Sequence, residues 1–269
     1  MMFLGLVTSI FSWVDSFSIG YLKTAADVGL YNAAVSLSSF LLIAPVLFLQ
    51  LFLPIITKEY SKKNFNVIKN LSKQLGKWIF LFNLPLLIIM LFFPGAVINL
   101  LFGSEYIQAE NALRFLSLGL FFSSLSQISE NLLSMIGKSK KTLFNLIIAT
   151  IINLLLNFLL IPRYGIDGAA ISTMISYFIW GGLSIFTAKY YTSITPIKKE
   201  TIKISLVAAV SAIGLVYIRN KIVLTTFNIF LTGIGFVIIY FGLIFLTHSL
   251  DRNDLVVISA IKKKIKTKL

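Results

Sequence analysis

The sequence contains no cysteine and a single histidine, and only 13% of its 269 residues are charged. Without cysteine there is no disulfide, iron–sulfur cluster or thiolate zinc site, and one histidine cannot build a histidine metal cluster. Neither a GxxxxGK[ST] phosphate loop nor a GxGxxG dinucleotide motif occurs. We therefore expect no catalytic residue, no metal, no cofactor and no enzyme. Any transport must use an energy source other than ATP hydrolysed by this chain.

Apolar residues dominate the chain. They make up 57% of it, aromatic residues make up 14%, and the mean hydropathy is +0.90. These values lie outside the range of soluble domains. The composition predicts an all-α, polytopic transmembrane helix bundle, in which each span needs roughly 20 apolar residues.

The apolar runs predict about eight spans. They are Met1–Tyr21, Asn32–Ile56, Trp78–Leu101, Asn111–Ile136, Thr142–Ile161, Ala169–Lys189, Ile202–Ile218 and Phe227–Thr247. The basic residues of the connections alternate between the two sides, with 19 on one side and four on the other. Because lysine and arginine are enriched in cytoplasmic loops, both termini are expected to be cytoplasmic, in a multi-pass protein of the inner or plasma membrane.

A net charge of +14 is also typical of proteins that bind nucleic acids. The basic residues sit between spans, and the chain lacks the basic and aromatic pattern of a nucleic-acid reader. No nucleic-acid partner is expected. The connection Lys58 to Lys77 and the C-terminal IKKKIKTKL have amphipathic spacing, which favours short helices on the anionic inner leaflet.

Asp15 is the first candidate for a functional site, because ionisable residues inside a membrane are costly unless they are buried in protein. On a helix it shares an arc of about 120° with Thr8, Ser9, Ser12 and Ser16. This arc predicts a polar interior, with Asp15 and Ser12 as cavity or ion-coupling residues. The alternative is a hydrogen-bonded helix seam in which Asp15 is hydrated near the outer interface.

Glu130 is the second candidate. It lies on a polar stripe of the fourth span together with Gln127, Ser123, Ser126 and Ser134. The stripe predicts a second cavity or ion-coupling position at Glu130 and Gln127. The alternative is an ion pair with Lys138 at the cytoplasmic mouth.

Three amides are weaker cavity candidates. Asn153 and Asn157 are four residues apart and share one helix face, which is more typical of contacts between helices than of ligand binding. Gln50 lies between Pro45 and Pro54, which free backbone carbonyls and bend the helix.

Three other residues are interpreted as structural. Arg114 lies opposite the Glu130 stripe, His248 lies at the end of the last span, and Trp78 is typical of an interfacial belt.

The stretch Asn153–Thr173 combines a membrane exit, a turn and a re-entry. Pro162 stops the helix, and Gly165 and Gly168 supply the freedom that a turn needs. Gly168, Ser172 and Ser176 then form a small-residue stripe that lets a neighbouring helix approach closely.

The sequence pattern LN-x-LLIP-x-YGI-x-GAA-x-ST in this stretch resembles that of the polysaccharide-exporter, O-antigen flippase branch of the multidrug/oligosaccharidyl-lipid/polysaccharide flippase superfamily. Two further stretches resemble it too, DSFSIGYLKTAADVGLYN (Asp15–Asn32) and LLFGSEYIQAENALRFLSL (Leu100–Leu118). The resemblance is to the C-terminal portion of these proteins. It implies that residues 1–190 are a six-helix second lobe, and that residues 191–269 are two trailing helices with a basic cytoplasmic tail.

The resemblance implies a flippase that moves lipid-linked oligosaccharide, on an undecaprenyl pyrophosphate carrier, for surface polysaccharides such as O-antigen and lipopolysaccharide. The lipid bilayer, an N-terminal lobe absent from this chain and polysaccharide-assembly proteins are the expected partners. A proton or sodium ion is the expected coupling ion. Two alternatives stay open: a multidrug and toxin cation antiporter of the same superfamily, and a half-transporter remnant or subunit that does not transport.

Overall fold

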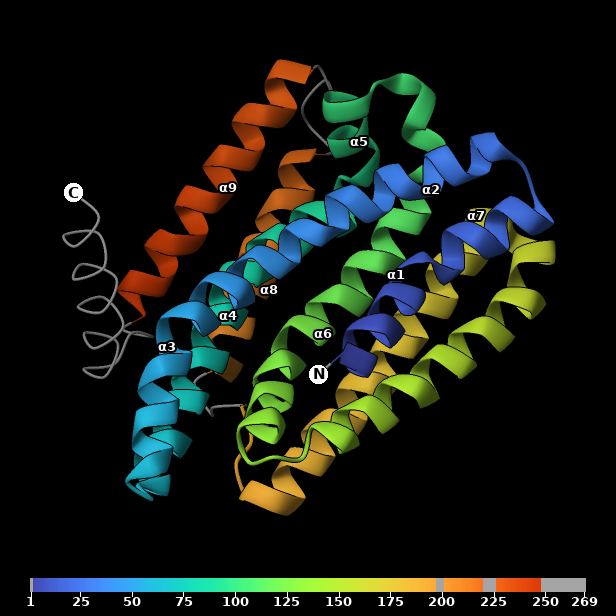
Figure 1. The fold of residues 1–269 in the computed structure, drawn as a ribbon. Coiled ribbons are helices and arrows are strands. Elements are labelled where there is room, and N and C mark those ends of the chain that lie inside the picture. The colour runs from blue at the N-terminus through green and yellow to red at the C-terminus, as the bar shows by residue number, and fades with distance from the viewer. Residues whose placement is uncertain (1, 197–200, 220–225, 248–269) are drawn as a thin grey trace, which may run out of the picture. The chain divides into compact units, whose positions relative to one another are not determined.

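The computed structural model describes residues 2–196, 201–219 and 226–247, and every regular element in these ranges is helical (Figure 1). The prediction of an all-α protein is therefore confirmed. By their contacts the residues form two compact units. The first comprises Met1–Pro45 and Leu86–Thr195, and the second comprises Val46–Pro85 and Pro196–Leu269.

The first unit contains most of the helices. In chain order they are α1 (Met2–Leu22), α2 (Ala25–Ser38), the 3-10 turn η1 (Ser39–Leu42), α5 (Pro94–Phe102), the 3-10 turn η2 (Ser104–Ala109), α6 (Glu110–Met135) and α7 (Ser139–Thr192). The second unit holds most of α3 (Ile43–Ser61) and α4 (Phe65–Phe92), with α8 (Thr201–Arg219) and α9 (Thr226–Leu246). The division into residues 1–190 and 191–269 concerns the lobes of a transporter and stays a prediction.

Four helical segments of the described chain are long and apolar enough to cross a membrane. They are Phe3–Leu22, Ala25–Ser61, Phe65–Phe92 and Ser139–Thr192, and two shorter apolar helices cover Thr201–Leu215 and Leu231–Leu246. The chain is thus a membrane helix bundle, as its composition predicts. α6 carries the expected fourth span but has six serines among its 26 residues, and it is not one of the four. The cytoplasmic placement of the termini stays a prediction.

The predicted fifth and sixth spans form the two arms of α7. The backbone is non-helical at Gly165, with φ 57° and ψ −134°, a conformation that favours glycine. Figure 1 shows that α7 turns back on itself about halfway along its length. A first arm (residues 139–164) and a second arm (residues 166–192) therefore run antiparallel. The predicted exit, turn and re-entry are confirmed. Pro162, however, does not stop the helix: it lies inside the first arm, and the backbone first leaves the helical conformation at Gly165.

Close approach of the two arms depends on the small-residue stripe. A Cβ atom at Gly168 would lie 2.5 Å from the Leu160 carbonyl oxygen, so only glycine fits there. Ser172 and Ser176 continue the stripe and are buried. Glycine also allows α6 and the second arm to pack tightly, because a Cβ atom at Gly119 would lie 2.8 Å from the Met174 Cα atom.

Two expectations about α4 are wrong. The predicted third span is not one helix, since α4 ends at Phe92 and α5 begins at Pro94, where proline occupies a first-turn position that needs no N–H donor. The connection Lys58–Lys77 does not form a separate surface helix. Its second half is the start of α4, because Ile68 and Leu75 lie one heptad apart and are both buried in the protein.

Two residues assigned to the membrane surface are buried in the second unit. Trp78 is only 8% exposed, and its ring centroid lies 5.9 Å from that of Phe48 and 5.8 Å from that of Phe82. The interpretation of Trp78 as an interfacial belt residue is therefore wrong. Lys77, counted among the connecting lysines, is also fully buried.

His248 and the C-terminal IKKKIKTKL lie outside the described residues.

Candidate functional site

Asp15 lies in the second half of α1 and is only 6% exposed. Its carboxylate accepts hydrogen bonds from the Tyr31 hydroxyl of α2 at 2.6 Å, from Asn157 Nδ2 of the first arm of α7 at 2.8 Å, and from the Thr173 hydroxyl of the second arm. Four chain segments thus meet at one buried carboxylate. The seam alternative is correct in that Asp15 joins helices, and its side chain is buried among them rather than exposed.

The position of Tyr31 follows from the short link between α1 and α2. The Thr24 side chain accepts from the Asp27 amide and the Asp27 carboxylate accepts from the Thr24 amide, so a capping box starts α2 at Ala25. Tyr31 then lies sixteen residues after Asp15, and the next pair repeats this spacing, since Ser16 Oγ donates to Asn32 Oδ1 at 3.0 Å. Two successive contacts therefore hold α2 against α1.

The hairpin of α7 brings the predicted asparagines to Asp15. Asn153 Nδ2 donates to Thr173 Oγ1 at 3.0 Å across the two arms, and Asn157 Nδ2 lies 3.3 Å from Asn153 Oδ1. Both asparagines have no exposed surface. We call Asp15, Tyr31, Asn153, Asn157 and Thr173 the Asp15 cluster.

The Asp15 cluster is suited to a proton or a hard cation. All the hydrogen-bond partners of Asp15 within the described residues are neutral, and Asn157 Oδ1 is buried without any partner. Carboxylate, amide and hydroxyl oxygens are the ligand types of hard cations. A buried carboxylate with no cationic partner is costly in a membrane protein, and a bound proton or cation would lower this cost.

Glu130 lies on α6 in a simpler environment. It is half-buried, and its carboxylate accepts from Ser126 Oγ of the same helix at 3.3 Å. The alternative of an ion pair with Lys138 is wrong, since none joins the two residues in the described chain. The Lys138 ammonium instead lies 5.1 Å from the centre of the Tyr191 ring.

The other candidates do not join the Asp15 cluster. Ser12 is exposed, and its hydroxyl donates to the Thr8 carbonyl at 2.9 Å in the same helix. Gln127 is half-buried on α6, where its backbone carbonyl accepts a hydrogen bond from Asn131 Nδ2 at 2.8 Å. Gln50 is exposed in the second unit and lines a depression on one side of α3 with Pro54. Their predicted roles stay predictions.

Tyr31 and Thr173 are the members of the cluster that sequence reasoning missed. Both lie inside the stretches that carry the family resemblance, at the end of DSFSIGYLKTAADVGLYN and at the end of the Asn153–Thr173 stretch. A tyrosine and a threonine are unremarkable in an apolar helix. Thr173 could have been found from the sequence, because a turn at Gly165 places residue 173 of the second arm opposite Asn153 of the first arm.

A second polar group fixes the start of α6. Arg114 Nε donates to the Leu91 carbonyl at 3.2 Å, and Nη1 donates to Asn111 Oδ1 at 2.6 Å. Asn111 Nδ2 lies 3.4 Å from Asp167 Oδ2 beside the α7 turn. These contacts join α6 to the end of α4 and to α7, which supports the structural interpretation of Arg114.

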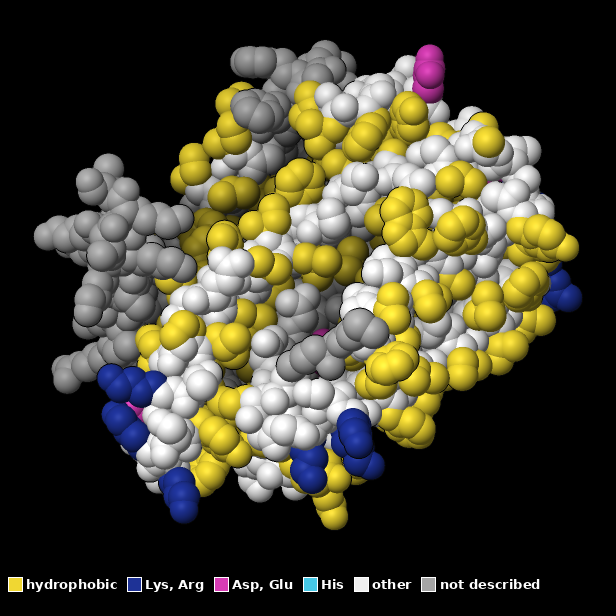
Figure 2. All heavy atoms as spheres, in the orientation of Figure 1, with side chains coloured by type: hydrophobic (Ala, Val, Ile, Leu, Met, Phe, Trp, Pro, Cys, Tyr) yellow, Lys and Arg dark blue, Asp and Glu magenta, His cyan; other side chains and the backbone are white. Residues whose placement is uncertain are grey.

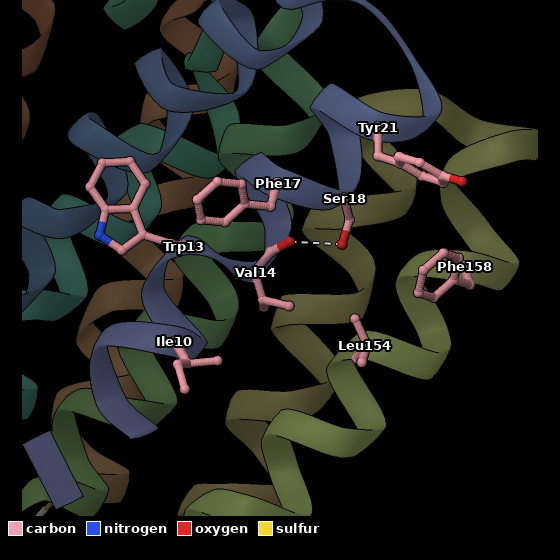
Figure 3. A pocket seen from close by; sticks show the side chains of 8 residues that line it. All are labelled: Ile10, Trp13, Val14, Phe17, Ser18, Tyr21, Leu154 and Phe158. Carbon is pink, nitrogen blue, oxygen red and sulfur yellow. Dashed lines mark hydrogen bonds between the residues drawn. The ribbon is translucent and has the colours of Figure 1, made fainter. Parts of the chain in front are cut away.

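An apolar groove of about 320 Å³ runs between α1 and the first arm of α7 (Figure 3). Its lining residues are Ile10, Trp13, Val14, Phe17, Ser18, Tyr21, Leu154 and Phe158. Figure 3 shows the side chains of Leu154 and Phe158 facing those of α1. The Ser18 hydroxyl is not available to a ligand, since it donates to the Val14 carbonyl at 2.7 Å.

Comparison with known proteins agrees with the resemblance. An uncharacterized membrane protein of Methanocaldococcus jannaschii is 34% identical over 61% of this chain and 32% of its own length. A Shigella flexneri protein whose name describes it as an O-antigen transporter is 30% identical over 62% of this chain and 40% of its own. A Haloferax volcanii protein named as a low-salt glycan biosynthesis flippase, Agl15, is 25% identical over 70% of this chain and 39% of its own length.

The fold is that of a solved flippase. The structure of the lipid II flippase MurJ in an inward closed conformation superposes on this chain with a TM-score of 0.76. The match covers 94% of this chain and 53% of the MurJ chain, and the sequences are 19% identical. The chain thus spans about half of that protein and 32% to 40% of the three relatives. The MatE family model matches residues 1–159, which is more than half of the chain, and the chain therefore belongs to the MatE family.

Proposed function

We propose that this protein is a membrane transporter that moves lipid-linked oligosaccharide from the inner to the outer leaflet of the cell membrane. Relatives named as an O-antigen transporter, a glycan biosynthesis flippase and a capsular polysaccharide biosynthesis protein support this substrate class. The flippase fold supports the mode of action. The product is surface polysaccharide, and the carrier is a lipid pyrophosphate of the undecaprenyl type.

The observation that carries transport is the Asp15 cluster. A buried carboxylate whose hydrogen-bond donors are all neutral is more stable with a bound proton or sodium ion than without one. Binding of the ion favours the conformation in which α1, α2 and both arms of α7 meet, and its release favours another. Such a difference in ion affinity between two states is what alternating access requires.

One observation favours a second candidate, the export of cationic drugs. Asp15 on α1 is buried and Glu130 on α6 is half-buried, and both are acidic, whereas the half-buried cation Arg114 lies at the start of α6 and donates to Leu91 and Asn111. A pyrophosphate headgroup prefers cations, whereas a cationic drug prefers carboxylates. The names of the relatives weigh more heavily, because they indicate glycan substrates.

Deletion of the gene tests the proposal. We expect loss of surface polysaccharide, accumulation of its lipid-linked precursor on the inner leaflet, and recovery of both when the gene is restored. Unchanged polysaccharide together with lowered resistance to cationic drugs would overturn the proposal in favour of the drug antiporter.

The coupling ion is tested separately with purified full-length protein in liposomes. A proton gradient or a sodium gradient, each imposed alone, is expected to drive uptake or flipping of lipid-linked oligosaccharide. Transport that is insensitive to both gradients would contradict the assignment of the Asp15 cluster.

A further inference from the structure

Within the described residues the chain passes between its two compact units three times, and a proline lies at each crossing. Pro45 in α3 is the last residue of the first unit before one crossing, and Pro85 in α4 is the last residue of the second unit before the next. Pro196 is the first residue of the second unit after the third crossing. A proline in a helix removes a backbone hydrogen bond, so the helix bends more readily there than elsewhere.

The crossing in α3 follows a change of helix type. The 3-10 turn η1 separates α2 from α3 within one continuous helical segment, Ala25–Ser61, and Pro45 comes directly afterwards in the first turn of α3. A 3-10 stretch in the middle of a long helix often marks a functional hinge. The segment therefore has two adjacent weak points where the first unit ends.

The crossing in α4 leaves one backbone carbonyl without a helical donor. In an α-helix the N–H of residue i+4 donates to the carbonyl of residue i, and Pro85 has no N–H to give to Leu81. Pro85 is the one proline of α4, all of which lies in the described chain, so Leu81 is the one interior carbonyl that is open in this way. Such a carbonyl is costly inside a membrane unless another group donates to it.

The hydroxyl of Tyr240 supplies the missing donor. Tyr240 lies on α9, has no exposed surface, and donates to the Leu81 carbonyl at 3.0 Å. The next residue of each helix adds a second contact, since the ring centroids of Phe241 and Phe82 lie 5.6 Å apart. A buried tyrosine hydroxyl needs an acceptor, and most carbonyls of a helix already have a donor. α9 is therefore fastened to α4 at the turn that Pro85 weakens.

The third crossing rests on the same helix. After α7 ends at Thr192, the backbone of Ser193 is left-handed with φ 55°, and a short link (residues 193–195) leads to Pro196. A Cβ atom at Gly76 would lie 1.9 Å from the Pro196 carbonyl oxygen, so glycine lets the chain lie directly on α4. Pro196 is thus held by the second unit, and the link before it is free of helical hydrogen bonds.

We propose that the second unit turns relative to the first about Pro45, Pro85 and the link before Pro196. Tyr240 anchors the second-unit side of this hinge. Because Tyr240 and Leu81 belong to the same unit, their hydrogen bond is kept while α4 bends after Pro85, and no carbonyl is left open in the membrane. A few residues that absorb the change in backbone angles are the usual basis of hinge motion.

The hinge is separate from the Asp15 cluster. That cluster lies on α1, α2 and α7, which all belong to the first unit. A change at Pro85 or Tyr240 is therefore expected to leave ion affinity at Asp15 unchanged. The hinge also does not depend on which substrate the protein transports.

Distances between spin labels on the two units test the hinge in the full-length protein in nanodiscs. This chain has no cysteine, so Asn66→Cys in the second unit and Lys140→Cys in the first supply its label sites. Both residues are exposed, and Figure 2 shows basic side chains accessible at the tip of α3 and α4, which carries the first label. We expect a broad or two-peaked distance distribution for this pair. Glu105→Cys with Lys140→Cys, both in the first unit, should give one narrow peak. Equally narrow distributions for both pairs would overturn the proposal.

A matched pair of prolines separates the hinge from ordinary helix bending. Pro85→Ala restores an N–H donor at a crossing, whereas Pro54→Ala restores one inside α3, within the second unit. We expect Pro85→Ala to narrow the distribution between the units towards that of the control pair, and Pro54→Ala to leave it unchanged. An unchanged width in Pro85→Ala, or equal narrowing in both variants, would overturn the hinge at Pro85.

The anchor is tested by combining Tyr240→Phe with Pro85→Ala. Alone, Tyr240→Phe leaves the Leu81 carbonyl without its donor, so we expect amide hydrogen exchange in the turn before Pro85 to rise about threefold. We also expect the distance distribution between the units to broaden. In Pro85→Ala the new N–H donates to Leu81, and Tyr240→Phe is then expected to have no effect on either measurement. An equal effect with and without Pro85→Ala would show that the hydroxyl acts elsewhere and would overturn the anchor.

Discussion

Asp15 and Glu130 are both carboxylates on polar stripes of predicted spans, yet their environments differ. Asp15 is held by three hydrogen bonds from α2 and both arms of α7. Glu130 has a hydrogen bond to Ser126 within its own helix and is half-buried. A change at Asp15 therefore alters how helices meet, whereas a change at Glu130 alters one helix locally. We therefore propose Asp15, rather than Glu130, as the ion-coupling residue.

Substitution of Asp15 by asparagine is expected to have the largest effect. It keeps the size of the side chain and removes the charge that a coupling ion neutralises. Hydrogen bonds to a charged group contribute about 1.5–3 kcal/mol, so we expect export to fall by about tenfold or more. Surface polysaccharide of a strain carrying the variant is the measurement, with the protein level in the membrane as control. Wild-type export at equal protein level would remove Asp15 from the mechanism.

Asn157→Leu is expected to have the next largest effect. It removes the donor to Asp15 and the buried oxygen that lacks a partner. Binding of the coupling ion, measured by titration calorimetry of the purified protein, is expected to weaken about tenfold. Asn145→Leu is the matched control, because it breaks a similar contact between the arms, to Thr187 at 3.3 Å, without touching Asp15. Equal losses in both variants would indicate a purely structural role for Asn157.

Tyr31→Phe removes one donor to Asp15 and keeps the aromatic ring. Hydrogen bonds inside membrane bundles contribute on average about 0.6 kcal/mol, with larger values for single contacts, so we expect ion affinity to fall about threefold. Tyr240→Phe is the control, since it removes a buried hydroxyl of the second unit that donates to the Leu81 carbonyl at 3.0 Å. If Tyr240→Phe weakens ion binding as much as Tyr31→Phe, the hydroxyl at Asp15 is not the cause.

Glu130→Gln is expected to have the smallest effect. The amide can still accept from Ser126, so export should change by less than about twofold. A loss as large as that of Asp15→Asn would reverse the comparison and place ion coupling on α6. The same export assay decides this outcome.

The described fold follows the sequence wherever the signal is local. Gly165 ends the first arm of α7 because its backbone conformation suits glycine, and this is visible in the sequence as the turn after Pro162. The break between α4 and α5 at Phe93 also has a local signal, which is Pro94. This break was not predicted from the sequence, because the residues on both sides form one continuous apolar run. The burial of Lys77 and Trp78 had no local signal, because it depends on which residues pack against α4.

The candidate site was predictable only in part. Helical periodicity placed Asp15 and Ser12 on one arc, and Asn153 and Asn157 on one face. It did not show that Ser12 is exposed while Asp15 is buried, nor that the weaker candidates Asn153 and Asn157 belong with Asp15. Periodicity describes a helix about its own axis and says nothing about which neighbour each side meets.

The sequence by itself determined that this is a membrane helix bundle of the MatE family with a helical hairpin at Gly165, since composition, apolar run length and turn residues are properties of short stretches. Only the tertiary structure decided the partners of Asp15. Asn157 and Thr173 lie 142 and 158 residues away along the chain, and the packing of α1 and α2 on both arms of α7 brings them within hydrogen-bonding reach.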